Sequence, residues 1–599
     1  MKSWNKIVAA LLAVILAAGL LAGCGSNATE ASTEAPAAEP AVEEAAEPVE
    51  EEPAAEPEEA PEVVEAAVTN VIGDGVNLSD PDYDFQAEYF FDDYNTQSNA
   101  DTDRQDGIDT FEDKDIVFKS LYFDELTYLL EQEGNYLILL GGSWCHNTRA
   151  VISYVNDFAK AYGIDTVYNF DFRLDGATRP THIRETALTP EYGGEDQLAA
   201  DWNYLYGELI DRYFTNLNDW VEYKEDTDSA LTWYDEVYVA ETVAKVQVPF
   251  LFLYNKDNTT RYVPVYDENG KQTSVEADET ASGTFPIVYG FEEMVDRDST
   301  GIYNSTNEDG TRNYITEDYT ARLQAVFDFI RDNGIEIDYY TDAEYLVDAF
   351  VEGNGRGHAP KLYDVFTEGE QINVEVITYR QMQWLLSQEG SAAIVFGGAW
   401  CANTTAAIGP INDYAVANDT IVYMMDFRLD GKHPIDFWGY DRDRQFEIRS
   451  TNQDGNAEEL AGSTYVGQPN PFAYLYTNLI NTYLTNVESV TDPSADNYYI
   501  TAVAEDGTEV KALRLQAPYF LSYNKDAVDA DGFPAPVLAW HEEMLEITEN
   551  SLERGSYIYQ KDNYASYTAG IENVLSALAE STGATFTPYT GEPRQELID

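Results

Sequence analysis

Two cysteines stand in the same short pattern at two places in the chain. The two stretches read Gly141-Gly142-Ser143-Trp144-Cys145-His146-Asn147-Thr148 and Gly397-Gly398-Ala399-Trp400-Cys401-Ala402-Asn403-Thr404. Each follows a short apolar run and leads into a segment with helical spacing. The first N–H groups of a helix are free and carry partial positive charge, which stabilises a thiolate and lowers the pKa of a cysteine. The pattern therefore predicts two thiol sites, with inert cysteines in small apolar niches as the alternative.

Other residues that can do chemistry recur close to the cysteines. Trp144 and Trp400 directly precede them and are expected to be packing walls or substrate contacts. The hexapeptide that starts at Asp171 recurs unchanged at 426–431, which places Arg173 and Arg428 near the end of a central strand. An arginine there can stabilise a thiolate or clamp a carboxylate. The alternative is an internal ion pair with an aspartate of the same hexapeptide.

These recurrences belong to a duplication that covers most of the chain. The two cysteines are 401 − 145 = 256 residues apart, and residues 123–130 match residues 379–386 at the same offset. The helix opening Tyr319-Thr320-Ala321 is matched by Tyr567-Thr568-Ala569. The sequence therefore predicts two copies of one unit, at 81–340 and 341–599.

Within one copy, hydrophobic spacing predicts helices that alternate with strands. Residues 123–130 have helical spacing, and Gly134 should end that helix. Short apolar runs predict strands at 136–140, 166–172 and 250–254, and the partner of the last is expected at 261–265 or 285–289. An amphipathic pattern over 198–217 predicts a helical insert, and 319–331 a final helix. This order indicates an α/β fold with a central mixed sheet flanked by helices.

Each copy resembles a thioredoxin-like domain. Trp-Cys at a strand-to-helix turn matches the start of that family's active-site motif, and Val248-Pro249 and Ala517-Pro518, each just before an apolar strand, match its cis-proline loop. The resemblance implies two tandem thioredoxin-like domains, each with a helical insert before the cis-Pro strand. It also implies that the backbone before each proline pairs with an extended substrate chain, whereas the alternative is a tight turn.

The chain departs from that family's Cys-x-x-Cys motif at one position. Thr148 and Thr404 occupy the place of the second cysteine, so neither site can attack a disulfide with one thiol and release the product with another. Monothiol chemistry is left: attack on a disulfide, capture of a low-molecular-weight thiol, or isomerisation in which the substrate supplies the second thiol. The two threonines are expected to donate a hydrogen bond to the thiolate. A disulfide between Cys145 and Cys401 is a further alternative.

The N-terminus has the order of a secretory signal. Lys2 and Lys6 precede an apolar run, and Leu21-Ala22-Gly23-Cys24 resembles a bacterial lipobox. The resemblance implies that residues 1–23 are removed and that Cys24 is lipidated; the alternatives are an uncleaved anchor or an ordinary secretory signal. Residues 24–80 are rich in Ala, Glu and Pro, and they should form a disordered acidic tether. Each alternative places the rest of the chain outside the cytoplasm, in a bacterial cell envelope.

The net charge of −75 limits the partners. It argues against nucleic acid, because a phosphate backbone needs Lys and Arg to neutralise it. A solubilising acidic surface is the simplest interpretation, and weak Ca²⁺ binding is a further expectation, although no complete D-x-D-x-D-G-x5-E loop occurs. No cofactor is expected, and no metal site, because the histidines lack metal-ligand spacing.

Three functions are consistent with these patterns. The first is a membrane-anchored protein that exchanges thiols and disulfides on envelope proteins or small thiols through single cysteines. The second is a non-catalytic protein that binds a peptide or a small ligand. The third is an acidic structural lipoprotein of the cell surface. The paired Trp-Cys and proline elements favour the first function, and the missing second cysteine favours the second.

Overall fold

The fold is that of a computed structural model, which describes residues 83–100, 110–178, 181–184, 204–221, 230–234, 240–292, 317–351, 365–367, 369–431, 446–449, 472–495, 498–503, 508–542 and 561–594. The chain divides into residues 1–65 and a compact unit of residues 66–599, and every contact below lies within the second. The signal segment, Cys24 and most of the tether lie outside the described residues, so the predictions made for them are untested.

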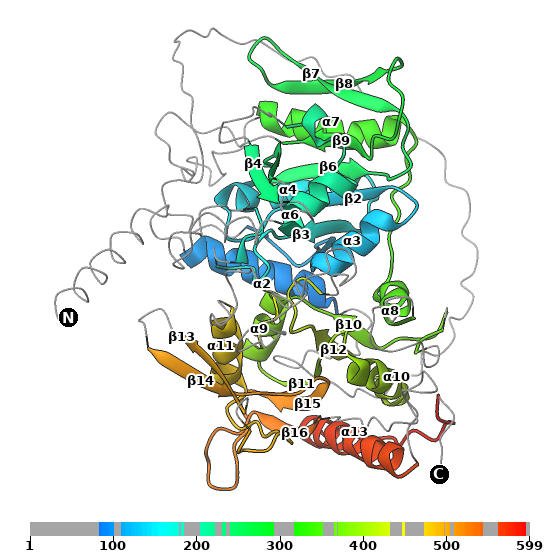
Figure 1. Cartoon of the computed structure of the whole chain (residues 1–599). Helices are drawn as coiled ribbons and strands as arrows, with labels where there is room; N and C mark the ends of the chain where they lie inside the picture. Colours follow the sequence, from blue (N-terminus) through cyan, green and yellow to red (C-terminus); the bar gives the residue numbers. More distant parts are fainter. Residues whose placement is uncertain are drawn as a thin grey trace, which may run out of the picture. The chain divides into compact units, whose positions relative to one another are not determined.

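The described part is a mixed α/β structure with two five-stranded sheets (Figure 1). The strands of the first sheet are β1 (Phe118–Leu121), β2 (Tyr136–Leu140), β3 (Val167–Phe170), β6 (Phe250–Tyr254) and β9 (Ile287–Phe291). Those of the second sheet are β10 (Val374–Val376), β11 (Ser391–Phe396), β12 (Val422–Met425), β15 (Tyr519–Asn524) and β16 (Val537–Glu542).

Both sheets have the same strand order and directions. The order is β1-β3-β2-β6-β9 in the first and β10-β12-β11-β15-β16 in the second. The first three strands of each sheet run parallel, and the last two run antiparallel to their neighbours. The central strands are apolar along their whole length, as expected for strands covered on both faces. Of the two partners predicted for 250–254, the later one is correct, because β9 pairs with β6.

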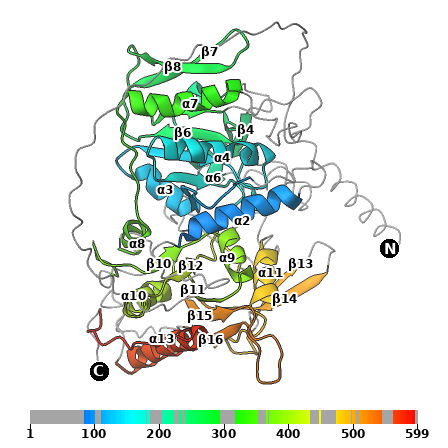
Figure 2. The ribbon, with the colours of Figure 1, turned by 180° about the vertical axis from the view of Figure 1, so that it is seen from behind.

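The helices cover the sheets and connect their strands. The first part of the chain contains α2 (Phe85–Ala100), α3 (Phe123–Glu131), α4 (His146–Ala161), α6 (Tyr204–Glu208) and α7 (Glu317–Asp332). The second part contains α8 (Asp342–Val351), α9 (Tyr379–Ser387), α10 (Ala402–Ala417), α11 (Ala473–Tyr483) and α13 (Lys561–Thr582). Figures 1 and 2 both show α13 running along β15 and β16.

The insert before each proline is only partly helical. In the first part, α6 continues into a π-helical turn, η2 (Leu209–Tyr213), and a 3₁₀ turn, η3 (Leu217–Asp219). A hairpin follows, made of β4 (Ala230–Tyr234) and β5 (Ala240–Ala244), and the second part has the matching hairpin β13 (Tyr499–Val503) and β14 (Glu509–Leu513). A third hairpin, β7 (Arg261–Tyr266) with β8 (Gln272–Asp278), lies between β6 and β9. The predicted helical insert is therefore present in both parts, but each also contains a hairpin that the sequence did not predict.

Candidate functional site

The first cysteine lies where a buried strand turns into a helix. Cys145 is the N-cap of α4, and its backbone N–H donates to the carbonyl of Gly142 at 3.0 Å. Its Sγ donates to the carbonyl oxygen of Val248 at 3.7 Å, and only 7% of the residue is exposed. The thiol therefore sits at the positive end of a helix, against the residue that precedes the proline.

The second cysteine has the same position in the second sheet. Cys401 is the N-cap of α10, and its Sγ donates to the carbonyl oxygen of Ala517 at 3.3 Å. It is more exposed than Cys145, and both are free thiols. The sequence predicted both positions correctly.

Both prolines are in cis, as the sequence predicted. The peptide bonds Val248-Pro249 and Ala517-Pro518 have this geometry, and β6 and β15 begin directly after them. The strand β6 runs antiparallel to β2, with Phe250 opposite Leu140. The start of β6 and the end of β2 therefore share one edge of the sheet, which brings the proline loop against the cysteine turn.

Thr148 and Thr404 each lie one turn into the helix that the cysteine caps. Both are fully buried, and among the described residues neither hydroxyl has a hydrogen-bond partner. A buried hydroxyl without a partner costs about 1–3 kcal/mol. The predicted hydrogen bond to sulfur is not made in this state, because each Sγ donates to a carbonyl instead.

The tryptophan before each cysteine is held by an aspartate and covered by an arginine. Trp144 Nε1 donates to Asp171 Oδ1 at 2.8 Å, and the backbone N–H of Arg173 donates to the same oxygen at 2.8 Å. The guanidinium carbon of Arg173 lies 3.8 Å from the centroid of the Trp144 ring, which is cation–π contact. Gly142 leaves room for this arrangement, since a Cβ there would collide with Asp171 and Trp144.

The second site repeats this arrangement. Trp400 Nε1 donates to Asp426 Oδ1 at 2.8 Å, and the backbone N–H of Arg428 donates to Asp426 Oδ1 at 2.8 Å. The guanidinium carbon of Arg428 lies 4.0 Å from the Trp400 ring centroid. Both predicted arginines thus act mainly as covers of the tryptophan, a role that the sequence analysis did not consider.

The two aspartates bind protons more tightly than usual. Burial raises the pKa of Asp171 to about 6, although the hydrogen bond from Trp144 opposes the shift. Burial likewise raises the pKa of Asp426 to about 7, against the hydrogen bonds from Arg428 and Trp400. Both carboxyls therefore titrate closer to neutral pH than an exposed aspartate.

Three side chains fix the segment between β5 and the first proline. Tyr206 donates to the carbonyl of Ala244 at 2.7 Å and accepts from the N–H of Val246 at 2.8 Å. Arg184 donates to the carbonyl of Val246, and Glu292 accepts from the N–H of Gln247 at 2.5 Å. Tyr476, Arg449 and Glu542 make the matching bonds in the second part.

Sequence reasoning missed the role of these side chains, although their recurrence was visible. Tyr204-Leu205-Tyr206 recurs as Tyr474-Leu475-Tyr476, and Glu292-Glu293-Met294 recurs as Glu542-Glu543-Met544. The recurrence of a tyrosine does not by itself distinguish a packing role from a hydrogen-bonding role. A buried tyrosine that meets both a carbonyl and an N–H instead holds backbone in place.

The two sites differ in one buried partner of the arginines. An isolated bridge joins Arg173 to His182 in the first part and Arg428 to Glu447 in the second. Glu447 forms ion pairs with Arg449 at 3.1 Å and with Arg428 at 3.8 Å. His182 instead packs its ring against Trp144, with ring centroids 5.4 Å apart. The second site therefore holds a buried carboxylate where the first holds an imidazole.

A polar pocket adjoins the first site. It encloses about 470 Å³, part of it open to solvent, and its walls include Asp93, Tyr94, Ser143, Asn169, Asp171, Arg173 and Arg380. The hydroxyl of Tyr94 is buried without a hydrogen-bond partner in the described part of the chain. Asp93, Tyr94 and Ser143 correspond, at the offset of 256, to Ala349, Phe350 and Ala399, and Asn169 corresponds, at the offset of 255 that holds from β3 to the recurrent hexapeptide, to Met424. These four polar side chains are therefore special to the first site, whereas Asp171 and Arg173 recur in the second.

Comparisons with known proteins add no assignment. No family model matches the chain, and no curated protein or solved structure matches it either. In the ranges that the structure describes, no three His, Cys, Asp or Glu side chains are grouped so as to hold a metal ion. None of the helices found in those ranges has the length and apolar character needed to span a membrane.

Proposed function

We propose that this chain is an envelope lipoprotein with two tandem thioredoxin-like domains, each doing monothiol thiol-disulfide exchange. The observation that carries the proposal is the position of the sulfur. In both parts a lone cysteine caps a helix and its Sγ contacts the carbonyl before a cis-proline, at 3.7 and 3.3 Å. Two independent copies of this arrangement argue against cysteines that merely fill space.

The threonine hydroxyls support a change of sulfur partner on ionisation. In the thiol form the S–H donates to a carbonyl, but a thiolate and a carbonyl oxygen repel each other. The thiolate would turn towards the N–H groups of the helix and towards Thr148 or Thr404, whose hydroxyls lack a partner in the thiol form. A hydroxyl left unpaired in one state and used in the other favours ionisation of the thiol.

The exchange reaction needs one protein thiol and a disulfide substrate. The thiolate attacks one sulfur of the substrate, the new S–S bond forms as the old one breaks, and the departing sulfur leaves as a thiolate that takes a proton from water. A second thiol, from the substrate or from a small molecule, then attacks the mixed disulfide and returns the cysteine. Envelope proteins and small thiols are the proposed substrates, because a functional lipobox at Leu21–Cys24 would put the chain outside the cytoplasm.

A binding function is the second candidate, and the burial of Cys145 favours it. Only 7% of this residue is exposed, and a polar pocket lies beside its turn. A protein that keeps the fold and holds a peptide or small ligand would have no need of an accessible sulfur. Cys401, which is less buried, does not share this feature.

Reaction of the full-length chain with glutathione disulfide separates the two candidates. We expect a glutathione adduct on Cys401 first and on Cys145 more slowly, and peptide mass spectrometry would locate each adduct. Cys145→Ser and Cys401→Ser are the matched controls, each of which should lose one adduct only. If neither cysteine reacts in the native chain while both react in urea, the exchange function is wrong and the binding function is favoured.

A further inference from the structure

Helices α2 and α8 each contact both parts of the chain at a shared joint: α2 packs on β1 and α9, and α8 packs on β10 and on the start of α3. Helix α8 follows the first part in the sequence and also contacts that part. The hydroxyl of Tyr345 donates to Asp124 at 2.8 Å, and Asp342 of the same helix forms an ion pair with Lys119. Helix α2 precedes the first part, yet Phe85 packs on Trp384 and Tyr423 of the second, with ring centroids 5.3 and 4.7 Å apart. Figures 1 and 2 show α2 running between the two sheets.

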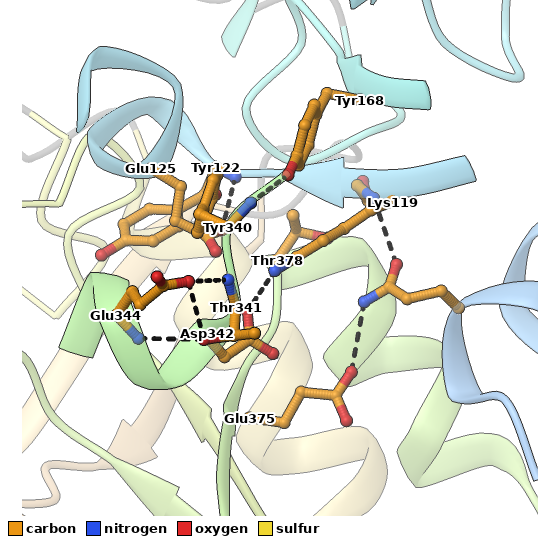
Figure 3. Close-up of polar contacts among 12 residues, drawn as sticks. Lys119, Tyr122, Glu125, Tyr168, Tyr340, Thr341, Asp342, Glu344, Glu375 and Thr378 are labelled. Carbon is orange, nitrogen blue, oxygen red and sulfur yellow. Dashed lines mark hydrogen bonds and ion pairs between the residues drawn. The ribbon is translucent and has the colours of Figure 1, made fainter. Parts of the chain in front are cut away.

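Four charged side chains are gathered in this joint (Figure 3). Lys119 of β1 forms an ion pair with Asp342 of α8, and the side chains are 15% and 22% exposed. Glu125 of α3 is 1% exposed, and its Oε1 has no hydrogen-bond partner in the described part of the chain. Glu375 of β10 accepts from Gln86 of α2 at 3.2 Å. One ammonium therefore serves three carboxyl groups.

The duplication explains why the charges do not balance. At the offset of 256, Lys119 corresponds to Glu375, Asp342 to Gln86 and Glu125 to Gln381. The ion pair Lys119–Asp342 is thus matched, on the other side of the joint, by the hydrogen bond between Glu375 and Gln86. Glu125 is fully buried and Glu375 partly buried. Within the described residues, neither forms an ion pair with a cation other than the shared Lys119.

We propose that this joint is a pH-sensitive device, which is tightly closed only while Glu125 and Glu375 carry their protons. Losing both protons would leave three carboxylates around Lys119, one of them, Glu125, almost fully buried. Unpaired buried charge is strongly unfavourable, so the two parts would loosen where these helices meet.

The titration of the two glutamates agrees with this geometry. Burial raises the pKa of Glu125 to about 8, with Asp342 adding to the shift and Lys119 opposing it. Burial and Asp342 raise the pKa of Glu375 to about 8 as well, against Gln86 and Lys119. Both groups bind protons more tightly in the folded chain than in the unfolded chain. Their protonation therefore stabilises the fold fully below about pH 4.5, and this stabilisation is lost as the pH rises towards about 8.

The other charged groups that face the cluster do not cancel this effect. For Lys119, burial opposes the charge, but Asp342 and Glu125 outweigh it and raise the pKa of the ammonium. The phenols of Tyr122, Tyr340 and Tyr345 have pKa values well above the ordinary value because they are buried. Besides Glu125 and Glu375 themselves, the carboxyls that act on these two groups are those of Asp84, Asp124 and Asp342.

The joint also reaches the loops that carry the site aspartates and arginines. A Cβ on Gly176 would lie 2.7 Å from Cβ of Arg380, and a Cβ on Gly431 would lie 2.5 Å from that of Asp124. Each of these glycines ends the recurrent hexapeptide of one part and rests on the start of α9 or α3 of the other. Loosening the joint at Glu125 would therefore release the support of both thiol sites.

The test compares melting temperatures of the full-length chain from pH 5 to pH 8.5. The variant Glu125→Gln with Glu375→Gln cannot lose these protons, so we expect it to melt within ~1 °C of the parent at pH 5 and ~4 °C or more above it at pH 8. Glu268→Gln with Glu276→Gln removes the same charge from the exposed β7–β8 hairpin, and it should follow the parent curve.

The proposal would be overturned if the melting temperature of the variant Glu125→Gln with Glu375→Gln differed from that of the parent by the same amount at every pH. The single variants guard against misfolding of the double variant. Each should give part of the gain at pH 8, and two singles without any gain would also overturn it. None of these outcomes depends on the cysteines, so the proposal stands or falls separately from the thiol function.

Discussion

At the scale of single residues, changing the unpaired threonine hydroxyls should affect the stability of the fold and the reactivity of the cysteines in opposite directions. Thr148→Val removes a buried hydroxyl that has no hydrogen-bond partner in the described structure. Because that hydroxyl costs free energy in the folded thiol form, we expect the free energy of unfolding to rise by about 1 kcal/mol. The same change should slow alkylation of Cys145 several-fold near neutral pH, because the thiolate loses a donor.

Peptide-resolved labelling together with urea denaturation checks this expectation. Thr404→Val is the matched control, and it should slow the alkylation of Cys401 while leaving the alkylation rate of Cys145 unchanged. A loss of stability without a change in labelling would assign the threonines to the packing of the helices.

The aspartates that hold the tryptophans should make stability depend on pH. Because the pKa of Asp171 rises from 3.8 to about 6 on folding, the neutral carboxyl stabilises the fold below about 3.8, and this contribution fades by about pH 6. Asp171→Asn mimics the neutral form. Relative to the parent, it should therefore gain stability between pH 4 and pH 6, by at most about 3 kcal/mol, and stay level above that.

Chemical denaturation of both proteins at each pH measures that difference. Asp426→Asn should gain stability relative to the parent over a wider pH interval, up to about pH 7, because burial raises the pKa of Asp426 further than that of Asp171. A constant difference between pH 4 and pH 8 would mean that the folded chain holds these carboxyls no differently from the unfolded chain.

At the scale of elements, the sequence predicted those whose pattern matches their surroundings. Helix α3 buries one face, so Phe123, Leu126 and Leu129 recur with helical spacing. The strands β2 and β6 are covered on both faces and read as unbroken apolar runs. The proline loops followed from a strand that begins directly after a proline.

The elements that were missed have weaker patterns. Helix α2 contacts both parts of the chain, with Phe85 on one and Phe90 on the other, so it has no single apolar stripe. The strands β1 and β10 have only four and three residues, too few for an alternation to be recognised. The cluster of charges in the joint was not predicted, because nothing in the sequence shows that Lys119 of β1 and Glu375 of β10 come close in the fold.

Adding a side chain where the recurrent hexapeptide contacts the helix of the other part should lower the free energy of unfolding. Gly176 has φ +69°, and an added Cβ would lie 2.7 Å from Cβ of Arg380. Gly163 has nearly the same backbone, φ +72°, but its Cβ would meet nothing within 4 Å. Gly163→Ala should therefore cost about 1–2 kcal/mol for backbone strain alone, and Gly176→Ala a further 1 kcal/mol or more, roughly.

Equilibrium unfolding in urea measures both costs under one condition. The difference between the two variants reports the packing of Gly176 on the second part of the chain. Equal costs would show that Arg380 moves aside freely and that the hexapeptide is not pressed against α9.

At the scale of the whole molecule, helix α2 couples the stability of the two sheets because it contacts both parts of the chain. Phe85 and Phe90 stand little more than one turn apart on α2. Phe85 packs on Tyr423 of β12, with ring centroids 4.7 Å apart, whereas Phe90 packs on Phe118 of β1 at 5.5 Å. Each is a buried aromatic, so truncation to alanine should cost about 3–5 kcal/mol.

Hydrogen exchange followed by mass spectrometry should show where each cost falls. Phe85→Ala should speed exchange in residues 374–376 and 422–425, which lie 374 − 85 = 289 to 425 − 85 = 340 residues further along the chain. The effect in 118–121 and 167–170 should be smaller. Phe90→Ala should do the reverse, and the two variants serve as controls for each other. If both loosen only the strands of the first sheet, α2 belongs to the first part alone and the two parts are stabilised independently. If the pattern divides as expected, α2 stabilises both parts, and the two cysteine sites rest on one shared scaffold.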